Sequence, residues 1–192
     1  ILPNGVNIDS FVPQGESAII PNRILFTGNM DYAPNIDAVQ YFVEDILPLI
    51  VEDIPAVEFI VAGQRPVKAV QALASDRVKI TGFIPNLAEE YAKAHVVVSP
   101  LRIGAGTQNK VLEALAMNQP VVCSQVGFAG LGLDNGKGIL MANNPRDFAD
   151  HVLSILKDNN LRKQLGETGG THVRETFAWS AVAKQLHQYF NN

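Results

Sequence analysis

Short apolar runs alternate with longer amphipathic stretches along most of the chain. The apolar runs occupy residues 24–27, 57–62, 78–81, 96–99, 120–124 and 138–141. Between them, a three-to-four-residue spacing of apolar positions predicts helices at residues 34–50, 67–74, 87–92 and 107–116. Strands that are apolar at nearly every position, and that alternate with helices, are typical of a parallel sheet covered on both faces. The pattern therefore predicts an α/β fold with a doubly wound parallel sheet.

The last quarter of the chain has a helical pattern almost to its end. This pattern starts at Pro145, and we expect breaks near Gly169 and Gly170 and again before Trp179. A final helix is expected at about residues 178–190. Because neither a repeat nor a shift in composition divides the sequence, we predict one domain over residues 1–192. The chain begins at Ile1 rather than with Met, so we expect it to be a piece of a longer protein.

Composition narrows the functional classes. With 192 residues, of which 47% are hydrophobic and 18% charged, the chain can bury a sizeable core. Its net charge of −4 and the lack of a basic stripe argue against nucleic acid as a partner. The lone Cys123 excludes an intrachain disulfide and a multi-cysteine metal site. No apolar run approaches the roughly 20 residues of a membrane span, and we expect a cytoplasmic location.

Ligands of doubly wound folds bind beyond the carboxyl ends of the strands. One loop there, "PLRIGAGTQNK", contains Gly104 and Gly106, which permit close backbone approach, and Thr107, which we predict to be the N-cap of the next helix. Such a helix start attracts an anion, and Arg102 and Lys110 could flank a diphosphate. The loop matches neither GxGxxG nor the P-loop pattern, so a plain tight turn is the alternative.

Glu113 follows this loop on the predicted helix. Helical side chains lean toward the N-terminus, so its carboxylate is expected to point back at the loop and to accept hydrogen bonds from vicinal hydroxyls, as on a ribose. A solvated or Lys110-paired surface glutamate is the alternative. Arg65, after "VAGQ", could contact a ligand anion or remain solvated, and Phe83 and Ile84 could wall a base pocket or close the core edge. The four histidines have no metal-site spacing, and we expect no metal ion.

Taken together, "LPNGVN", "ILFTGNM", "FIVAG", "ITGFIPNL", "VVVSPLRIGAGTQNKVLEALAMNQPVV" and "FAWSAVAKQL" resemble the C-terminal, donor-binding half of family-4 (group 1) glycosyltransferases, in particular exopolysaccharide-type sugar transferases. The resemblance is collinear and covers nearly the whole chain. It implies a GT-B fold, of which this chain is one Rossmann-like half that binds a nucleotide-diphosphate sugar. An N-terminal acceptor domain is expected before Ile1, and the helix at about residues 178–190 is expected to cross back to it.

The resemblance also assigns roles to residues. It implies that Gly104, Ala105, Gly106 and Thr107 meet the donor phosphates and sugar, that Glu113 binds the ribose, that the loop at Gly28 and Asn29 faces the donor, and that Phe83 and Ile84 lie by the base. Three positions depart from the family pattern. Ala105 stands eight residues before Glu113, where a sugar-binding glutamate is common. Asn29 stands where a diphosphate-binding arginine is frequent, and Pro34 or Asn35 stands where a lysine is frequent. Our hypothesis is that Arg102 and Lys110 supply the missing positive charge.

The implied chemistry is glycosyl transfer with retention of anomeric configuration, in polysaccharide or glycoconjugate synthesis, with no cofactor and no obligatory metal. No catalytic residue is assigned in this half, and we expect this piece alone to be inactive. Any association with a membrane surface is expected through the preceding half only. Two other interpretations stay open, a nucleotide-sugar 2-epimerase half and a non-catalytic nucleotide-binding or interaction module.

Overall fold

The computed structural model describes residues 4–15 and 18–191, so the first and last residues of the predicted domain lie outside the described residues. Within these ranges the strands form one sheet: β1 (Arg23–Thr27), β2 (Glu58–Ala62), β3 (Val78–Gly82), β4 (Val96–Ser99), β5 (Val121–Cys123) and β6 (Leu140–Met141). Their order is β3-β2-β1-β4-β5-β6, and every adjacent pair is parallel. The order reverses between β1 and β4, which confirms the doubly wound prediction.

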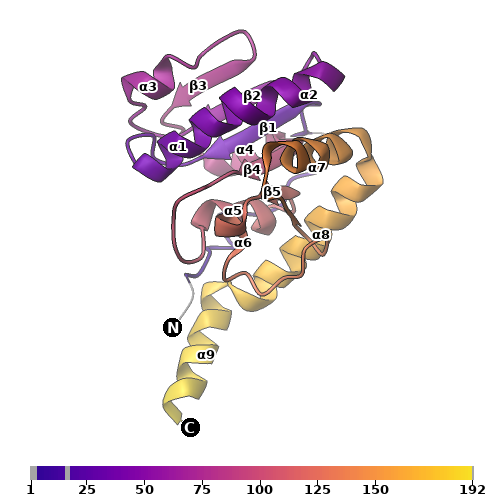
Figure 1. Ribbon diagram of the computed structural model, residues 1–192. Coiled ribbons are helices and arrows are strands. Elements are labelled where there is room, and N and C mark those ends of the chain that lie inside the picture. Colours follow the sequence, from indigo (N-terminus) through magenta and orange to yellow (C-terminus); the bar gives the residue numbers. More distant parts are fainter. Residues whose placement is uncertain (1–3, 16–17, 192) are drawn as a thin grey trace.

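Helices cover both faces of this sheet (Figure 1). They are α1 (Ala33–Tyr41), the π-helical η2 (Phe42–Ile46), α2 (Leu47–Asp53), α3 (Lys68–Gln71), α4 (Leu87–Lys93), α5 (Asn109–Ala116), α6 (Gln125–Phe128), α7 (Pro145–Lys157), α8 (Asn159–Thr176) and α9 (Trp179–Asn191). Neighbouring residues of a strand enter opposite layers, so Phe26 packs with α1 and α7 while Leu25 packs with α4, α5 and α8. Two apolar layers therefore hold the sheet in place.

Helices α1, η2 and α2 form one continuous helical segment, close to the predicted helix at residues 34–50. The π turn of η2 immediately precedes Leu47 and Pro48. Proline lacks the N–H that would continue the α-helical pattern, and its ring would clash with the preceding turn. A local change to wider i→i+5 turns accommodates it, and the helix continues.

The predicted break near Gly169 and Gly170 is wrong, because α8 runs through both glycines. A Cβ on Gly169 would lie 2.6 Å from the carbonyl oxygen of Gly138, and one on Gly170 would lie 1.9 Å from Oδ1 of Asn118. These glycines let α8 pack closely against neighbouring loops. The actual break lies at Asp158, whose carboxylate caps α8 by accepting hydrogen bonds from the amides of Asn160 and Leu161.

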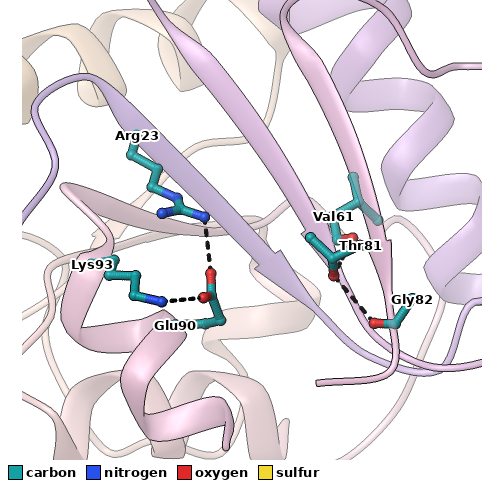
Figure 2. A network of polar contacts seen from close by, with 6 residues as sticks. All are labelled: Arg23, Val61, Thr81, Gly82, Glu90 and Lys93. Carbon is teal, nitrogen blue, oxygen red and sulfur yellow. Dashed lines mark hydrogen bonds and ion pairs between the residues drawn. The ribbon is translucent and has the colours of Figure 1, made fainter. Parts of the chain in front are cut away.

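An ion-pair network fixes α4 against the sheet (Figure 2). The buried Glu90 accepts hydrogen bonds from Arg23 at 2.9 Å and from Lys93 at 2.7 Å. Arg23 opens β1 and Glu90 lies on α4, so the pair ties this helix to the amino end of the central strand. Figure 2 also shows Thr81 of β3, whose hydroxyl donates to the carbonyl oxygens of Val61 and Gly82. The position of α4 matters because it carries Tyr91, described below.

The N-terminal segment of the described chain meets the start of α9. The Val6 amide donates a 2.8 Å hydrogen bond to the carbonyl oxygen of Phe177, and Val6 forms a parallel bridge with Ala178. Helix α9 then extends away from the sheet (Figure 1), which agrees with the predicted final helix. Among the described residues, no helix has the length and apolar character to cross a membrane.

Candidate functional site

A cavity of about 500 Å³ opens at the carboxyl edge of the sheet. The loop after β1, the loop after β2, the segment between β3 and α4, and the start of α5 form its walls. Its lining residues are Asn4, Thr27, Gly28, Asn29, Tyr32, Asn35, Ala62, Gly63, Gln64, Phe83, Ile84, Leu87, Ala105, Thr107, Gln108, Asn109, Lys110 and Glu113. The cavity therefore lies beside the reversal in strand order, where doubly wound folds bind ligands.

Two glycines bring the loops after β1 and β2 into direct backbone contact. A Cβ on Gly63 would lie 1.6 Å from the carbonyl oxygen of Gly28, and one on Gly28 would lie 2.6 Å from Nδ2 of Asn35. Real Cβ atoms do not approach other heavy atoms this closely, so a side chain at Gly63 would require a shift of the backbone and one at Gly28 would displace the Asn35 side chain. The loop at Gly28 and Asn29 lines the cavity.

Lys110 is a buried cation at the cavity wall. The residue is 9% exposed. Its Nζ atom donates a hydrogen bond to Oδ1 of Asn35, and this Nζ lies 4.4 Å from the ring centroid of Phe26. Burial lowers the pKa of Lys110 to about 7, although the nearby Glu113 carboxylate opposes this shift. Within the described part of the chain no carboxylate lies within ion-pair distance of Nζ. The site therefore contains a buried amine that forms no ion pair with any described carboxylate.

Glu113 lies one helical turn further along α5 and also lines the cavity. The hydroxyl of Tyr91 is 2.9 Å from its Oε2 atom. Burial raises the pKa of Glu113, while the Tyr91 hydrogen bond and the charge of Lys110 act in the opposite direction. The carboxylate is thus neither fully solvated nor ion-paired with Lys110. The structure therefore does not match the alternative of a surface glutamate that is either solvated or paired with Lys110.

The remaining predicted residues divide into two groups. The cavity brings Ala105, Thr107, Phe83 and Ile84 together with the residues above, and Phe83 is 70% exposed at its rim. It is not lined by the other predicted residues, namely Gly104, Gly106, Arg65 and Arg102. The prediction of Thr107 as N-cap is wrong, because α5 begins at Asn109 and its N-cap is Gln108. The backbone carbonyl of Thr107 accepts a hydrogen bond from the Asn4 side chain.

Both predicted arginines are paired with aspartates outside the cavity wall. Arg102 donates from Nε to Oδ2 of Asp37 at 3.0 Å and stacks 4.6 Å over the Tyr41 ring, beside a separate hollow of about 250 Å³. Arg65 pairs with Asp31 at 3.2 Å. The position of Arg102 follows from α1, which presents Asp37 and Tyr41 toward the loop after β4. Lys110 is therefore the predicted cation that lines the cavity.

The sequence indicated no role for Asn35 or Tyr91. Asn35 is 6% exposed and joins two loops, because its Oδ1 accepts from Lys110 while its Nδ2 donates to the Asn29 carbonyl at 2.9 Å. An asparagine directly after the helix-opening proline was the available signal for it. Tyr91 offered no signal, since its position fits the apolar face of α4 and its hydroxyl partners come from distant segments. No group of three or more His, Cys, Asp or Glu residues in the described ranges could hold a metal ion.

Comparison with known proteins gives one family match. The family model described as "Glycosyl transferases group 1" matches residues 21–158. A D-inositol 3-phosphate glycosyltransferase of Corynebacterium jeikeium is 26% identical, over 99% of this chain and 51% of that protein. The chain thus spans about half the length of this relative.

Two solved structures have the same fold. A sucrose-phosphate synthase from Thermosynechococcus elongatus has a TM-score of 0.80 at 23% identity, over 99% of this chain and 51% of that one. The Anabaena protein Alr3699/HepE, in complex with UDP and glucose, has a TM-score of 0.78 at 13% identity, over 98% and 55% of the two chains. The similarity extends over nearly all of this chain and about half of each neighbour.

Proposed function

This chain belongs to the glycosyl transferases of group 1, and from that premise we propose that its cavity binds the nucleotide-diphosphate sugar donor of a glycosyl transfer. The observation that carries the proposal is the buried Lys110, which lines the cavity, forms no ion pair with a carboxylate of the described ranges and lies on the same helix as Glu113. A buried cation is costly unless an anion pairs with it. A diphosphate would supply that anion, while the carboxylate of Glu113 would accept the ribose hydroxyls.

The walls of the cavity suggest how the donor lies. The diphosphate would contact Nζ of Lys110 and the first backbone amides of α5, where the helix dipole also favours negative charge. The ribose would lie at Glu113, and the base between the loop after β2 and the rim residues Phe83 and Ile84. Ala105 offers no carboxylate to the sugar, so recognition in this half is directed at the nucleotide more than at a particular sugar.

In the proposed reaction, the bond between the anomeric carbon and the diphosphate oxygen breaks, the acceptor hydroxyl oxygen forms the new glycosidic bond, and the proton of that hydroxyl passes to the departing nucleoside diphosphate. Lys110 and the amides of α5 would stabilise the negative charge that develops on the departing nucleoside diphosphate. We propose retention of anomeric configuration and no requirement for a bound metal or cofactor. The stereochemistry would be read from the anomeric configuration of the product, and the metal requirement from activity in the presence of a chelator.

The complete protein would contain an acceptor domain in addition to this chain. Support comes from the coverage of the relatives, each of which is about twice as long as the matched region. We propose a cytoplasmic enzyme of polysaccharide or glycoconjugate synthesis, whose contact with a membrane surface, where present, is made by the acceptor domain. The donor binds in this half and the acceptor in the other.

The donor proposal is tested by thermal stabilisation with a panel of UDP-, GDP- and ADP-sugars. One donor class is expected to raise the melting temperature, since a ligand that binds only the folded state stabilises it. No shift with any donor at millimolar concentration would contradict the proposal and favour a non-catalytic interaction module. A 2-epimerized nucleotide sugar, formed by the complete protein without an acceptor, would favour the epimerase interpretation.

The role of Lys110 is tested by Lys110→Met, which keeps the length of the side chain and removes its charge. Donor affinity is expected to fall about tenfold or more, the loss of one charge-assisted contact to a phosphate. Lys68→Met is the matched control, because Lys68 is exposed on α3 and does not line the cavity. Arg102→Ala, measured alongside, tests whether Arg102 also contributes charge to the diphosphate; equal affinities of the wild type and Lys110→Met would refute the role of Lys110.

A further inference from the structure

Tyr91 is a fully buried residue of α4 that lies behind the cavity wall. Its ring packs edge-to-face on Phe11, with a centroid separation of 5.9 Å. Its hydroxyl reaches three oxygens, namely Oγ1 of Thr27 at 2.7 Å, Oε2 of Glu113 at 2.9 Å and the carbonyl oxygen of Lys110 at 3.2 Å. Phenylalanine could fill the same space, so packing alone does not explain the hydroxyl.

The directions of these hydrogen bonds follow from the number of available protons. A tyrosine hydroxyl has one proton, and a carboxylate only accepts. Burial raises the pKa of Tyr91 well above its ordinary value, and the adjacent Glu113 charge raises it further, so the phenol keeps its proton. The charge-assisted bond to Oε2 of Glu113 is the strongest of the possible donations. The Thr27 hydroxyl then donates to the Tyr91 oxygen, which gives a relay from Thr27 through Tyr91 to Glu113.

This relay fixes one oxygen of the carboxylate and leaves the other for a ligand. Oε2 accepts the hydrogen bond of Tyr91, which lies behind the cavity wall, whereas Oε1 has no hydrogen bond from any described residue. The titratable groups that face Glu113 are Lys110 on the same helix and Tyr91 from α4. The other polar side chains of the cavity are neutral, and the ion pairs of Glu90, next to Tyr91 in the sequence, hold α4 against the sheet (Figure 2).

We propose that Tyr91 is a positioning residue, which orients the carboxylate of Glu113 toward the vicinal hydroxyls of the donor ribose and thereby makes the site select ribonucleotides over 2′-deoxyribonucleotides. This inference rests on the proposed donor site. Without the Tyr91 donor, the carboxylate can rotate away from the cavity axis and holds its negative charge less well. Both effects weaken the contact with the 2′-hydroxyl and leave the diphosphate contact at Lys110 in place.

The test is Tyr91→Phe, which removes only the hydroxyl. Calorimetry would compare UDP, ADP and GDP with their 2′-deoxy forms, and inorganic diphosphate would serve as a probe of the Lys110 side alone. For the nucleotide that binds, the wild type is expected to prefer the ribo form about tenfold or more. In Tyr91→Phe this preference should fall about three- to tenfold, with the affinity for inorganic diphosphate unchanged.

The pH profile separates positioning from a purely structural role. Since the Tyr91 hydrogen bond lowers the pKa of Glu113, its loss should move the pH below which the ribo preference disappears to a higher value in Tyr91→Phe. Thr27→Val, which removes the first donor of the relay, should reduce the preference in the same direction by a smaller factor. A wild-type preference and pH profile in both variants would overturn the inference while the donor site stands. A wild-type protein that binds none of the nucleotides would overturn the proposed function itself.

Discussion

At the scale of single residues, Lys110 shows how the site differs from the rest of the core. The buried Glu90 has charged partners in Arg23 and Lys93, whereas Lys110 has an amide oxygen and a ring face. A charge kept in such surroundings opposes folding and favours ligand binding. The same residue therefore serves the proposed function at the expense of stability.

This cost predicts a pH dependence of stability. The pKa of Lys110 is about 7 in the folded protein against about 10.5 in the unfolded chain, so between these values the unfolded state binds a proton that the folded state lacks. The free energy of unfolding should therefore rise with pH across this window, by up to about 1.4 kcal/mol per pH unit from this group. Lys110→Met should be more stable than the wild type near pH 6, and the difference should shrink toward pH 9.

Urea denaturation of both proteins at several pH values measures this difference. Subtracting the two curves removes the contributions of the groups that titrate alike in both proteins. Lys68→Met, with its exposed side chain, should follow the wild type at every pH. Parallel curves for the wild type and Lys110→Met would show that the folded protein does not depress the pKa of Lys110.

The sequence predicted the location of the site better than its contacts. Gly28, Lys110 and Glu113 could be placed at one edge of the sheet because strand ends and helix starts follow from local patterns. The position of Arg102 could not be predicted, because its partner Asp37 is 65 residues away in the sequence. The ion pair with Asp37 holds the guanidinium outside the cavity wall. Tyr91 was missed for the same reason, since its hydroxyl partners lie 64 and 22 residues away in the sequence.

At the scale of elements, α8 shows why the predicted break near Gly169 and Gly170 failed, whereas the predicted break before Trp179 is confirmed. Glycine within a helical pattern usually signals weakness, so Gly169 and Gly170 suggested a break. The structure uses Gly170 for close packing against Leu115 and Asn118 at the end of α5, and Gly169 for close packing against Gly138. Tertiary contacts outweigh the local preference here, and a single sequence does not reveal such contacts.

Gly166 provides a test of this close packing. A Cβ at this position would lie 2.0 Å from the backbone carbonyl oxygen of Asn118, directly beyond the end of α5. Gly166→Ala is expected to destabilise the protein by about 1–3 kcal/mol, because the overpacking strain exceeds the gain of roughly 1 kcal/mol in helix propensity. Urea denaturation would measure the change.

Thr171→Ala is the matched control, since Thr171 is exposed in the middle of the same helix. It should leave stability unchanged or raise it by a few tenths of a kcal/mol, as expected from helix propensity alone. Equal stabilisation by both alanines would mean that α8 does not press on the segment after α5. Destabilisation by Gly166→Ala would instead link α8 to the helix that carries Lys110 and Glu113.

At the scale of the whole molecule, the described N-terminal segment joins the start of α9 to the cavity. Val6 bridges to Ala178, and Asn4 donates to the Thr107 carbonyl and to Oδ1 of Asn109 at 3.2 Å. Because Asn4 and Asn109 both line the cavity, the corner where the N-terminal segment meets the start of α9 is continuous with the proposed donor site. A change in the packing of this corner should therefore alter the affinity of the cavity for its ligand.

The contact between Gly5 and Trp179 provides a test of whether the N-terminal segment connects the start of α9 to the cavity. A Cβ on Gly5 would lie 2.6 Å from the ring of Trp179, so Gly5→Ala forces the ring or the N-terminal segment to move. We expect faster hydrogen exchange at the Val6 amide and weaker donor binding, because Asn4 moves with Gly5.

In a Trp179→Ala background the ring is gone, so adding Gly5→Ala should change neither quantity further. Ser180→Ala, at an exposed neighbouring position of α9, should leave both at the wild-type values. If Gly5→Ala had the same effect in both backgrounds, the disturbance would arise from the backbone of the segment, and the contact with Trp179 would not couple the corner to the cavity.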